Sequence, residues 1–366
     1  MEPELRVVIA GGGTGGHLYP GIAVARELLA RRGGAIVTFA GTARGIEARV
    51  VPREGFQLDT IRSGGLKGKS ILNRARGAFL IPLSLLDAWA IVSRRRPHVV
   101  LGVGGYSSGP VVLMAAARRI PTLLLEQNAV PGLTNRLLSR VVRAAAVSYE
   151  STRSFFGSNA FVSGNPVRAE FLDAGTRRHD DQDADARGVN VLIFGGSQGA
   201  HAINQAMVNA ASALANADVP LRITHQTGER DLDMVKAGYA AAGLSAEVEP
   251  FLYDMGARLK AADLVVCRAG ATTLAELAAA GKPSVLIPLP TATDDHQRKN
   301  AEEFASAGAA EMLLQATASG PALAMRITAL AKDAGARRRM GGAARAMARP
   351  DAAKVIADRA LELAGV

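Results

Sequence analysis

The chain has 366 residues, of which 48% are hydrophobic and 21% are charged, a balance that indicates an ordered globular protein of roughly two domains. Basic residues outnumber acidic ones by 43 to 33, and the net charge of +10 favours an anionic partner such as a phosphorylated substrate or an acidic lipid surface. Aromatic residues make up only 4%, which argues against a nucleic-acid-binding protein that stacks bases on aromatic rings.

The sequence also bounds the compartment. Its single cysteine, Cys267, excludes an intrachain disulfide and a cysteine-based metal cluster. The first residues lead into a predicted strand without the apolar core of a signal peptide. The longest apolar stretch, 78–92, contains Asp87 and is shorter than the about 20 residues that span a bilayer. We therefore expect a cytoplasmic protein that touches a membrane, if at all, from one side.

The first half of the chain alternates predicted strands with helical patterns. The strands are expected at 6–10, 35–40, 56–61, 98–103, 122–125 and 144–147. Such alternation predicts a parallel sheet covered by helices on both faces. A charged connector follows at 177–185, whose Asp-x-Asp spacings resemble metal-binding pairs. Because no strand flanks them, we expect a solvated loop and no metal.

The second half repeats this scheme. Its strands are expected at 189–194, 221–225, 246–250, 264–267, 284–287 and 310–313, and Ala- and Arg-rich helices run from about 321 to the end. The sequence thus predicts an α/β protein with two Rossmann-like, doubly wound parallel-sheet domains of about six strands each. A ligand is expected in the cleft between them.

Each half opens with a buried strand that runs into a glycine-rich loop. The loops are Gly-Gly-Thr-Gly-Gly-His at 12–17 and Gly-Gly-Ser-Gln-Gly at 195–199, half the chain length apart. Glycines let backbone N–H groups approach a phosphate, so the matched pair favours a diphosphate over two plain turns. The first loop also fits the dinucleotide fingerprint, but the strand at 35–40 lacks the acidic residue that would bind ribose, which disfavours that alternative.

A third loop follows the strand at 264–267. Small residues there expose the start of the next helix to phosphate. Glu276, near the end of the second turn of this helix, is placed to accept hydrogen bonds from ribose hydroxyls, unless it is an ordinary surface residue. Gln297 and Asn300 share one face of a further predicted helix and suit sugar hydroxyls.

In this order the motifs resemble the membrane-associated N-acetylglucosaminyltransferases of peptidoglycan synthesis. Besides the two loops, the matching segments are Gly-Gly-Tyr-Ser-Ser-Gly-Pro at 104–110, Glu-Gln-Asn at 126–128, Gly-Asn-Pro-Val-Arg at 164–168 and Asp-His-Gln at 295–297 with Asn300. The resemblance covers essentially the whole chain. It implies a GT-B fold and inverting transfer of GlcNAc from UDP-GlcNAc to the MurNAc 4-hydroxyl of undecaprenyl-diphospho-MurNAc-pentapeptide (lipid I), which yields lipid II.

The same resemblance implies domain limits and substrate contacts. An acceptor domain would span 1–166, with a last helix at about 347–366 packing back on it, and a UDP-GlcNAc domain would span 167–346. The implied donor-binding residues are Thr14, Gly15, Gly16, Asn128, Arg168, Ser197, Leu252, Ala271, Thr272, Thr273, Leu274, Ala275, Glu276 and Gln297, with uracil bound by the main chain at Leu252. The implied acceptor contacts are His17, Tyr106 and Asn128. Neither a metal nor a cofactor is implied.

Inverting transfer needs a base for the acceptor hydroxyl. His17 is the first candidate because imidazole titrates near neutrality, although it alternatively only binds the acceptor or supports its loop. Glu126 is the second candidate, with anchoring of its own loop as the alternative. The leaving diphosphate would be stabilised by Ser197 and by the helix N-termini after Gly199 and Gly270.

The stretch between 67 and 96 predicts a membrane contact. Apolar residues flanked by basic ones suit shallow insertion among anionic headgroups, while a plain core helix explains the apolar pattern about equally well. The expected contacts are Lys67, Lys69, Ile71, Leu72, Arg74, Phe79, Leu83 and Trp89. We expect a peripheral protein on the cytoplasmic side of the inner membrane, with cell-wall synthesis proteins as further partners.

Other function classes are less well supported. A UDP-GlcNAc epimerase of the same architecture would bind the same donor without a membrane acceptor, and another glycosyltransferase would use a different lipid acceptor. A non-enzymatic scaffold is expected to have eroded loops in one half. Both glycine loops are intact, which argues against the scaffold.

Overall fold

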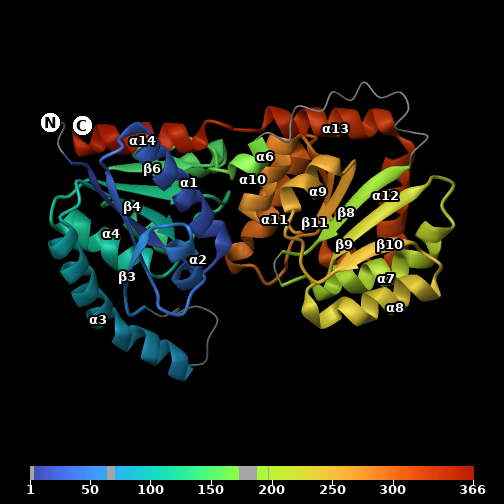
Figure 1. Ribbon diagram of the computed structural model, residues 1–366, viewed down its shortest axis with the longest axis horizontal. Helices are drawn as coiled ribbons and strands as arrows, with labels where there is room; N and C mark the ends of the chain where they lie inside the picture. Colours follow the sequence, from blue (N-terminus) through green and yellow to red (C-terminus); the bar gives the residue numbers. More distant parts are fainter. Residues whose placement is uncertain (1–3, 64–70, 173–187, 197) are drawn as a thin grey trace. The chain divides into compact units, whose positions relative to one another are not determined.

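The computed structural model describes residues 4–63, 71–172, 188–196 and 198–366, with only the backbone described at 71–79 and 169. The chain forms two compact units (Figure 1). The first unit comprises Met1–Arg168 and Arg349–Val366, and the second comprises Ala169–Ala348. The last helix of the chain therefore belongs to the first unit.

The first unit is built on a seven-stranded parallel sheet. The strand order is β3-β2-β1-β4-β5-β6-β7, and the chain order changes direction between β1 and β4. The strands are β1 (Arg6–Gly11), β2 (Ile36–Gly41), β3 (Gln57–Thr60), β4 (Val99–Gly104), β5 (Thr122–Glu126), β6 (Ala144–Val147) and β7 (Ala160–Val162). In such sheets ligands bind beside the carboxyl ends of the strands where the order reverses, which here are the ends of β1 and β4.

Helices cover both faces of this sheet. They are α1 (Gly15–Arg31), α2 (Glu47–Arg53), α3 (Ile71–Arg95), α4 (Ser108–Ala117), α5 (Leu133–Leu138) and α14 (Ala352–Ala364). Val7 and Ile9 of β1 share a core with α1 and α14, whereas Val8 and Ala10 share the opposite core with α3 and α4. Because alternate residues of each strand enter different cores, β1 and β4 read as continuous apolar runs.

The second unit has a six-stranded parallel sheet in the order β10-β9-β8-β11-β12-β13. Its strands are β8 (Val189–Phe194), β9 (Leu221–Gln226), β10 (Ala246–Glu249), β11 (Leu264–Cys267), β12 (Ser284–Leu286) and β13 (Ala310–Met312). Its helices are α6 (Ala169–Leu172), α7 (His201–Ala215), α8 (Leu232–Ala241), α9 (Met255–Ala261), α10 (Ala271–Ala280), α11 (His296–Ser306), α12 (Gly320–Lys332) and α13 (Ala334–Ala346). The order again reverses between the first strand of the unit, β8, and β11.

The prediction of two Rossmann-like parallel-sheet domains is confirmed. Every predicted strand is present, with ends that differ by at most one residue. The strand β7 is not predicted from the sequence, because a strand of three residues leaves too short an apolar run to be distinguished from a loop. Within the part of the chain that the structure describes, no helix has the length and apolar character needed to cross a bilayer.

Candidate active site

The first glycine loop follows β1, at the point of the sheet where the strand order reverses between β1 and β4. The pairing of β1 with β4 slips between Ala10 and Gly11, where the loop begins. A side chain is excluded at Gly11, since a Cβ would lie 2.5 Å from the carbonyl oxygen of Gly104. Likewise, a Cβ at Gly105 would lie 2.5 Å from the carbonyl oxygen of Gly12. The loops after β1 and β4 thus meet backbone to backbone, which only glycine permits.

His17 is held at this junction. It lies in the first turn of α1 and is half-buried. Its Nδ1 lies 3.1 Å from the hydroxyl of Thr14, the N-cap residue. The ring packs on Gly104, where a Cβ would lie 2.7 Å from Cδ2 of His17. Tyr106 follows in the loop after β4 and is 46% exposed. The structure therefore brings Thr14, His17 and Tyr106 to one edge of the sheet.

Glu126 ends β5, the next strand along. It is 3% exposed, and its carboxylate accepts four hydrogen bonds. Oε1 accepts from the backbone and side-chain amides of Asn128 at 3.0 and 3.2 Å, and Oε2 accepts from Gly132 N at 3.1 Å and Asn135 Nδ2 at 2.9 Å. Burial raises the pKa of Glu126, and these hydrogen bonds offset that rise only in part. The geometry favours an anchor for the loop that carries Asn128 over a general base.

Arg168 closes the first unit against α1. Its guanidinium lies 5.3 Å from the ring centroid of Tyr19, within the range of a cation–π contact. The resemblance placed Arg168 among donor-binding residues. The structure shows that Arg168 contacts the helix that follows the glycine loop, α1, through Tyr19.

The second glycine loop has the corresponding position after β8. Gly199 has φ +72°, and a Cβ there would overlap the carbonyl of Thr227 in the loop after β9. Gln226 Nε2 donates to the carbonyl oxygen of Gly196 at 2.9 Å. Ser197, expected to contact the diphosphate, lies outside the described residues.

A buried polar network supports this second loop. His225 is fully buried; its Nδ1 lies 2.7 Å from the hydroxyl of Tyr239 and its Nε2 lies 3.0 Å from Oδ1 of Asn204. Asn204 Nδ2 donates to the carbonyl of Thr227 and to Asp231. Because the amide oxygen of Asn204 only accepts, Nε2 of His225 carries the proton. Burial lowers the pKa of His225 to about 3, so the ring stays neutral.

The third loop and α11 form one connected group. Gly270 is the N-cap of α10, and Glu276 on that helix is 8% exposed, which excludes the alternative of an ordinary surface residue. Asn300 Nδ2 donates to the carbonyl of Ala269 at 3.2 Å, and Gln297 Oε1 accepts from Leu289 N at 3.0 Å. The structure therefore places the start of α10 beside α11.

Residues 271–275 line the first turn and a half of α10. Leu274 is buried, while Ala271, Thr272, Thr273 and Ala275 are half-buried. The segment thus anchors itself by Leu274 and leaves part of its first turn accessible, as a phosphate at a helix N-terminus requires.

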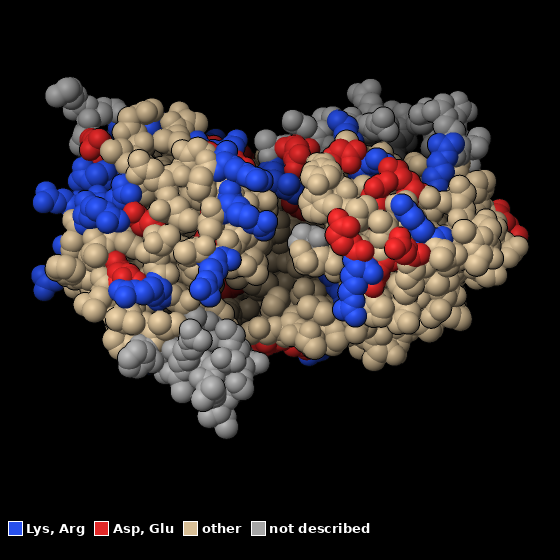
Figure 2. All heavy atoms as spheres, turned by 60° about the horizontal axis from the view of Figure 1, so that its bottom comes forward, with Lys and Arg blue, Asp and Glu red and all other residues tan. Residues whose placement is uncertain are grey.

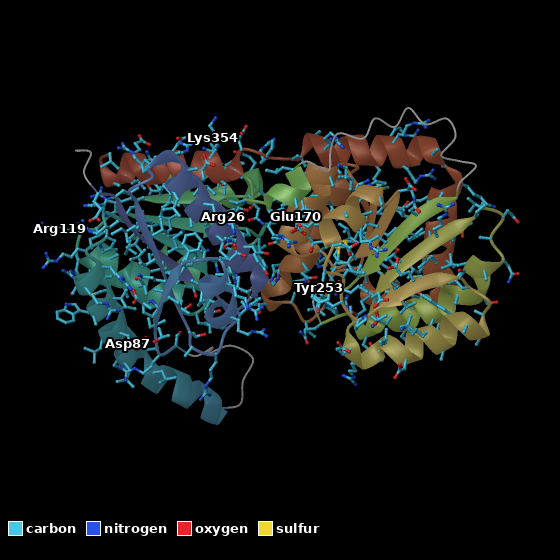
Figure 3. The ribbon with its side chains drawn as sticks, viewed as in Figure 1. Arg26, Asp87, Arg119, Glu170, Tyr253 and Lys354 are labelled. Carbon is cyan, nitrogen blue, oxygen red and sulfur yellow. The ribbon has the colours of Figure 1, made fainter. Side chains whose placement is uncertain are left out.

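Leu252, expected to bind uracil through its main chain, follows β10. Its side chain is 4% exposed and lies between two aromatic residues. Tyr253, labelled in Figure 3, is 92% exposed, and its ring packs edge-on against Phe251 at 4.9 Å between centroids. A buried Leu252 side chain agrees with a role for its backbone rather than its side chain.

The expected membrane contacts are only partly described. Lys67 and Lys69 lie outside the described residues, and only the backbone is described at Ile71, Leu72, Arg74 and Phe79. Leu83 is half-buried and Trp89 is 55% exposed. Between them Leu86 is 61% exposed, whereas Ile91 lies in the core. The helix α3 thus has both a core face and an exposed apolar face. Among the charged side chains of the first unit, Lys and Arg predominate over Asp and Glu on the surface that Figure 2 shows.

Sequence reasoning missed Glu47, the first residue of α2. Its buried carboxylate accepts a hydrogen bond from Gly13 of the first glycine loop. The available signal was an acidic residue shortly after Gly41, which ends β2, but an acidic residue in the first turn of a helix is common.

Comparison with known protein families matches both halves of the chain. Residues 7–147 match the glycosyltransferase family 28 N-terminal domain, and residues 190–356 match the glycosyltransferase family 28 C-terminal domain. The boundary between the two matches falls near the boundary between the two structural units.

Individual proteins match along nearly their full length. A protein of Anaeromyxobacter sp. (strain K), named UDP-N-acetylglucosamine--N-acetylmuramyl-(pentapeptide) pyrophosphoryl-undecaprenol N-acetylglucosamine transferase, is 48% identical over 360 residues, covering 98% of this chain and 93% of the relative. A protein of the same name from Pelobacter propionicus is 48% identical over 375 residues, covering 98% and 99%. The crystal structure of Acinetobacter baumannii MurG has a TM-score of 0.81 at 33% identity, covering 98% of this chain and 99% of that one.

Proposed function

The chain belongs to glycosyltransferase family 28, and from this premise we propose that it transfers GlcNAc from UDP-GlcNAc to the MurNAc 4-hydroxyl of lipid I, giving lipid II. The observation that carries the proposal is the near full-length match, at 48% identity, to relatives named as this transferase. The resemblance and the GT-B fold expected from the sequence are confirmed, and the protein is a glycosyltransferase.

The first unit supplies the groups that act on the acceptor. The acceptor hydroxyl loses its proton to His17 and attacks C1 of GlcNAc from the face opposite UDP, which leaves with the bonding electrons and inverts the anomeric centre. The hydrogen-bond distance between Nδ1 of His17 and the Thr14 hydroxyl supports this role, because it fixes the ring orientation. Tyr106, exposed nearby, and Asn128 contact the acceptor. Glu126 holds the loop of Asn128 in place.

The second unit supplies most of the groups that bind the donor. The amides of the second glycine loop and the N-terminus of α10 stabilise the negative charge that develops on the diphosphate, since both present backbone N–H groups at helix starts. Glu276 accepts hydrogen bonds from the ribose hydroxyls, Gln297 binds the sugar, and the main chain at Leu252 binds uracil. From the first unit, the residues Thr14, Gly15, Gly16, Asn128 and Arg168 complete the donor contacts.

The exposed face of α3 is the proposed membrane contact. Ile81, Leu86 and Trp89 are 45%, 61% and 55% exposed, respectively, and α3 ends with Arg94 and Arg95. Large apolar side chains beside cations suit the interface of an anionic bilayer. The lipid-linked acceptor would then reach the enzyme from the cytoplasmic leaflet of the inner membrane.

Transfer of labelled GlcNAc to a short-chain lipid I analogue tests the function. The reaction is run with and without acceptor and with chelator present, and the product linkage is determined. A β-1,4-linked disaccharide that forms only with the acceptor supports the proposal. Epimerisation of UDP-GlcNAc without acceptor would instead indicate an epimerase, and donor binding without turnover would indicate a scaffold.

A further inference from the structure

The carboxylate of Glu47 lies beneath the first glycine loop, and we infer that Glu47 is a positioning residue that holds this loop and thereby orients Thr14 and His17. The inference rests on the proposed function, in which His17 takes the proton of the acceptor hydroxyl. Glu47 is separated from Gly13 by 34 positions in the chain, so only the fold brings them together.

The carboxylate is enclosed and fully hydrogen-bonded. Glu47 is 0% exposed. Its Oε2 accepts the N–H of Gly13 at 2.8 Å, and its Oε1 accepts the backbone N–H and the hydroxyl of Thr42 at 2.8 and 2.7 Å. The Thr42 hydroxyl itself accepts from Gly45 N at 3.1 Å, which directs its proton toward Glu47.

Three glycines make room for this carboxylate. A Cβ at Gly12, Gly41 or Gly45 would overlap the side chain of Glu47. These glycines belong to the first loop, to the end of β2 and to the turn before α2. The backbone of three segments is therefore shaped around a single acidic side chain.

The groups around Glu47 require an ionised acceptor. Burial alone would raise the pKa of Glu47, but the hydrogen bonds from Gly13 and Thr42 outweigh burial and lower it from its ordinary value of 4.5. Every group that contacts the carboxylate in the hydrogen bonds above is a donor. A glutamine in its place would turn its NH₂ toward a donor in either orientation, and one backbone N–H would lose its acceptor.

The link from Glu47 to the reacting group is short. Gly13 precedes Thr14, and the Thr14 hydroxyl lies 3.1 Å from Nδ1 of His17. A loop that shifts at Gly13 moves this hydroxyl and releases the orientation of the imidazole. Misplacement of a reacting group by about 1 Å costs on the order of 100-fold in rate.

A double-mutant cycle with His17 tests the inference. We expect Glu47→Gln to lower kcat about 100-fold in the wild-type background but less than about threefold in the His17→Ala background, because both changes disable the same group. Glu47→Asp keeps the charge and is expected to recover part of the loss. Glu150→Gln is the matched control, since the Glu150 side chain is 73% exposed, and it should leave kcat unchanged. A full 100-fold loss in the His17→Ala background would overturn the inference.

Hydrogen exchange tests the loop itself without any substrate. The amides of the peptide covering 11–18 should exchange at least about tenfold faster in Glu47→Gln than in the wild type or in Glu150→Gln. If Glu47→Gln does not fold, Glu47→Asp takes its place in this comparison. Unchanged exchange in a folded variant would overturn the inference. A wild-type protein without transferase activity would overturn only the proposed function, and hydrogen exchange would then decide by itself whether Glu47 holds the loop.

Discussion

The two glycine-rich loops occupy equivalent places in their sheets, yet they are held by different chemistry. In the first unit an ionised carboxylate, Glu47, accepts the N–H of Gly13. In the second unit the groups that contact the loop directly are neutral: Gln226 donates to Gly196, and Gly199 packs on the carbonyl of Thr227. A carboxylate offsets the positive potential of loop amides, whereas neutral supports leave that potential for a ligand. The first loop therefore suits the positioning of a side chain, and the second suits the binding of a diphosphate.

The largest expected effect is a difference in kcat between alanine variants of the two histidines that follow the two loops, His17 and His201. His17→Ala should lower kcat by about 10²–10⁴-fold, because it would remove the proposed base. His201→Ala, at the start of α7 after the second loop, should cost only a few-fold, since the His201 side chain is 52% exposed and pairs with the carboxylate of Asp231. Steady-state kinetics on the lipid I analogue measures both.

The pH–rate profile adds a control for His17. Its acid limb should disappear in His17→Ala and persist in Glu126→Gln if Glu126 is an anchor. Equal losses for His17→Ala and His201→Ala would contradict the division of roles between the two loops.

A side chain added to the second glycine loop should give the next largest effect. Gly199→Ala would overlap Thr227 and strain a residue at φ +72°, so we expect UDP affinity to fall about 100-fold, or about 3 kcal/mol. Gly342→Ala in α13 is the matched control, because a Cβ at Gly342 meets nothing within 4 Å. Titration calorimetry with UDP measures both variants. Unaltered affinity in Gly199→Ala would show that the loop shape is not needed for the donor.

As the pH is lowered, the stabilisation that depends on His225 near the second loop should be lost before the stabilisation that depends on Glu47 under the first loop. Because the pKa of His225 is about 3 in the fold and about 6.5 when unfolded, the unfolded state takes up a proton that the fold excludes. The free energy of unfolding should therefore fall by about 1 kcal/mol per pH unit as pH drops below about 6.5. Because the pKa of Glu47 is lowered in the fold, its ionised carboxylate stabilises the folded state at neutral pH. This contribution to the free energy of unfolding begins to be lost only when the pH falls below about 4.5, the ordinary pKa of a glutamate.

Urea denaturation between pH 7 and pH 5 measures this difference. His225→Gln, which cannot titrate, should show a flatter dependence in this range, while Glu47→Gln should keep the slope of the wild type. A wild-type stability that does not change between pH 7 and pH 5 would contradict the role given to His225.

The smallest expected effect is on membrane binding, measured for substitutions of exposed apolar residues in each of the two units. The double substitution of Leu86→Ser and Trp89→Ser on α3 should weaken binding to vesicles that contain anionic lipid about tenfold, since it removes apolar area that would enter the interface. Met325→Ser is the control, because Met325 is 64% exposed on α12 of the second unit. Vesicle sedimentation measures both, and equal binding of all variants would place the membrane contact elsewhere.

The sequence by itself determined the two sheets and the two loops. The strands β1 and β8 end in the apolar runs 7–10 and 191–194, each followed by glycines, and both signals are local, so they could be read without the fold. The start of α10 and the pairing of Gln297 with Asn300 on one helix face were equally local. The whole-chain order of motifs then indicated the family.

Only the tertiary structure decided how these parts are held. Glu47 meets Gly13 across 34 positions of the chain, and no periodicity marks such a contact. The burial of Glu276 depends on segments that pack from elsewhere in the chain. The four donors around Glu126 come from the loop and helix that directly follow β5, and only the folded path of that loop directs them at one carboxylate. A local pattern predicts which element a residue belongs to, but the ionisation and orientation of its side chain depend on neighbours that only the fold supplies.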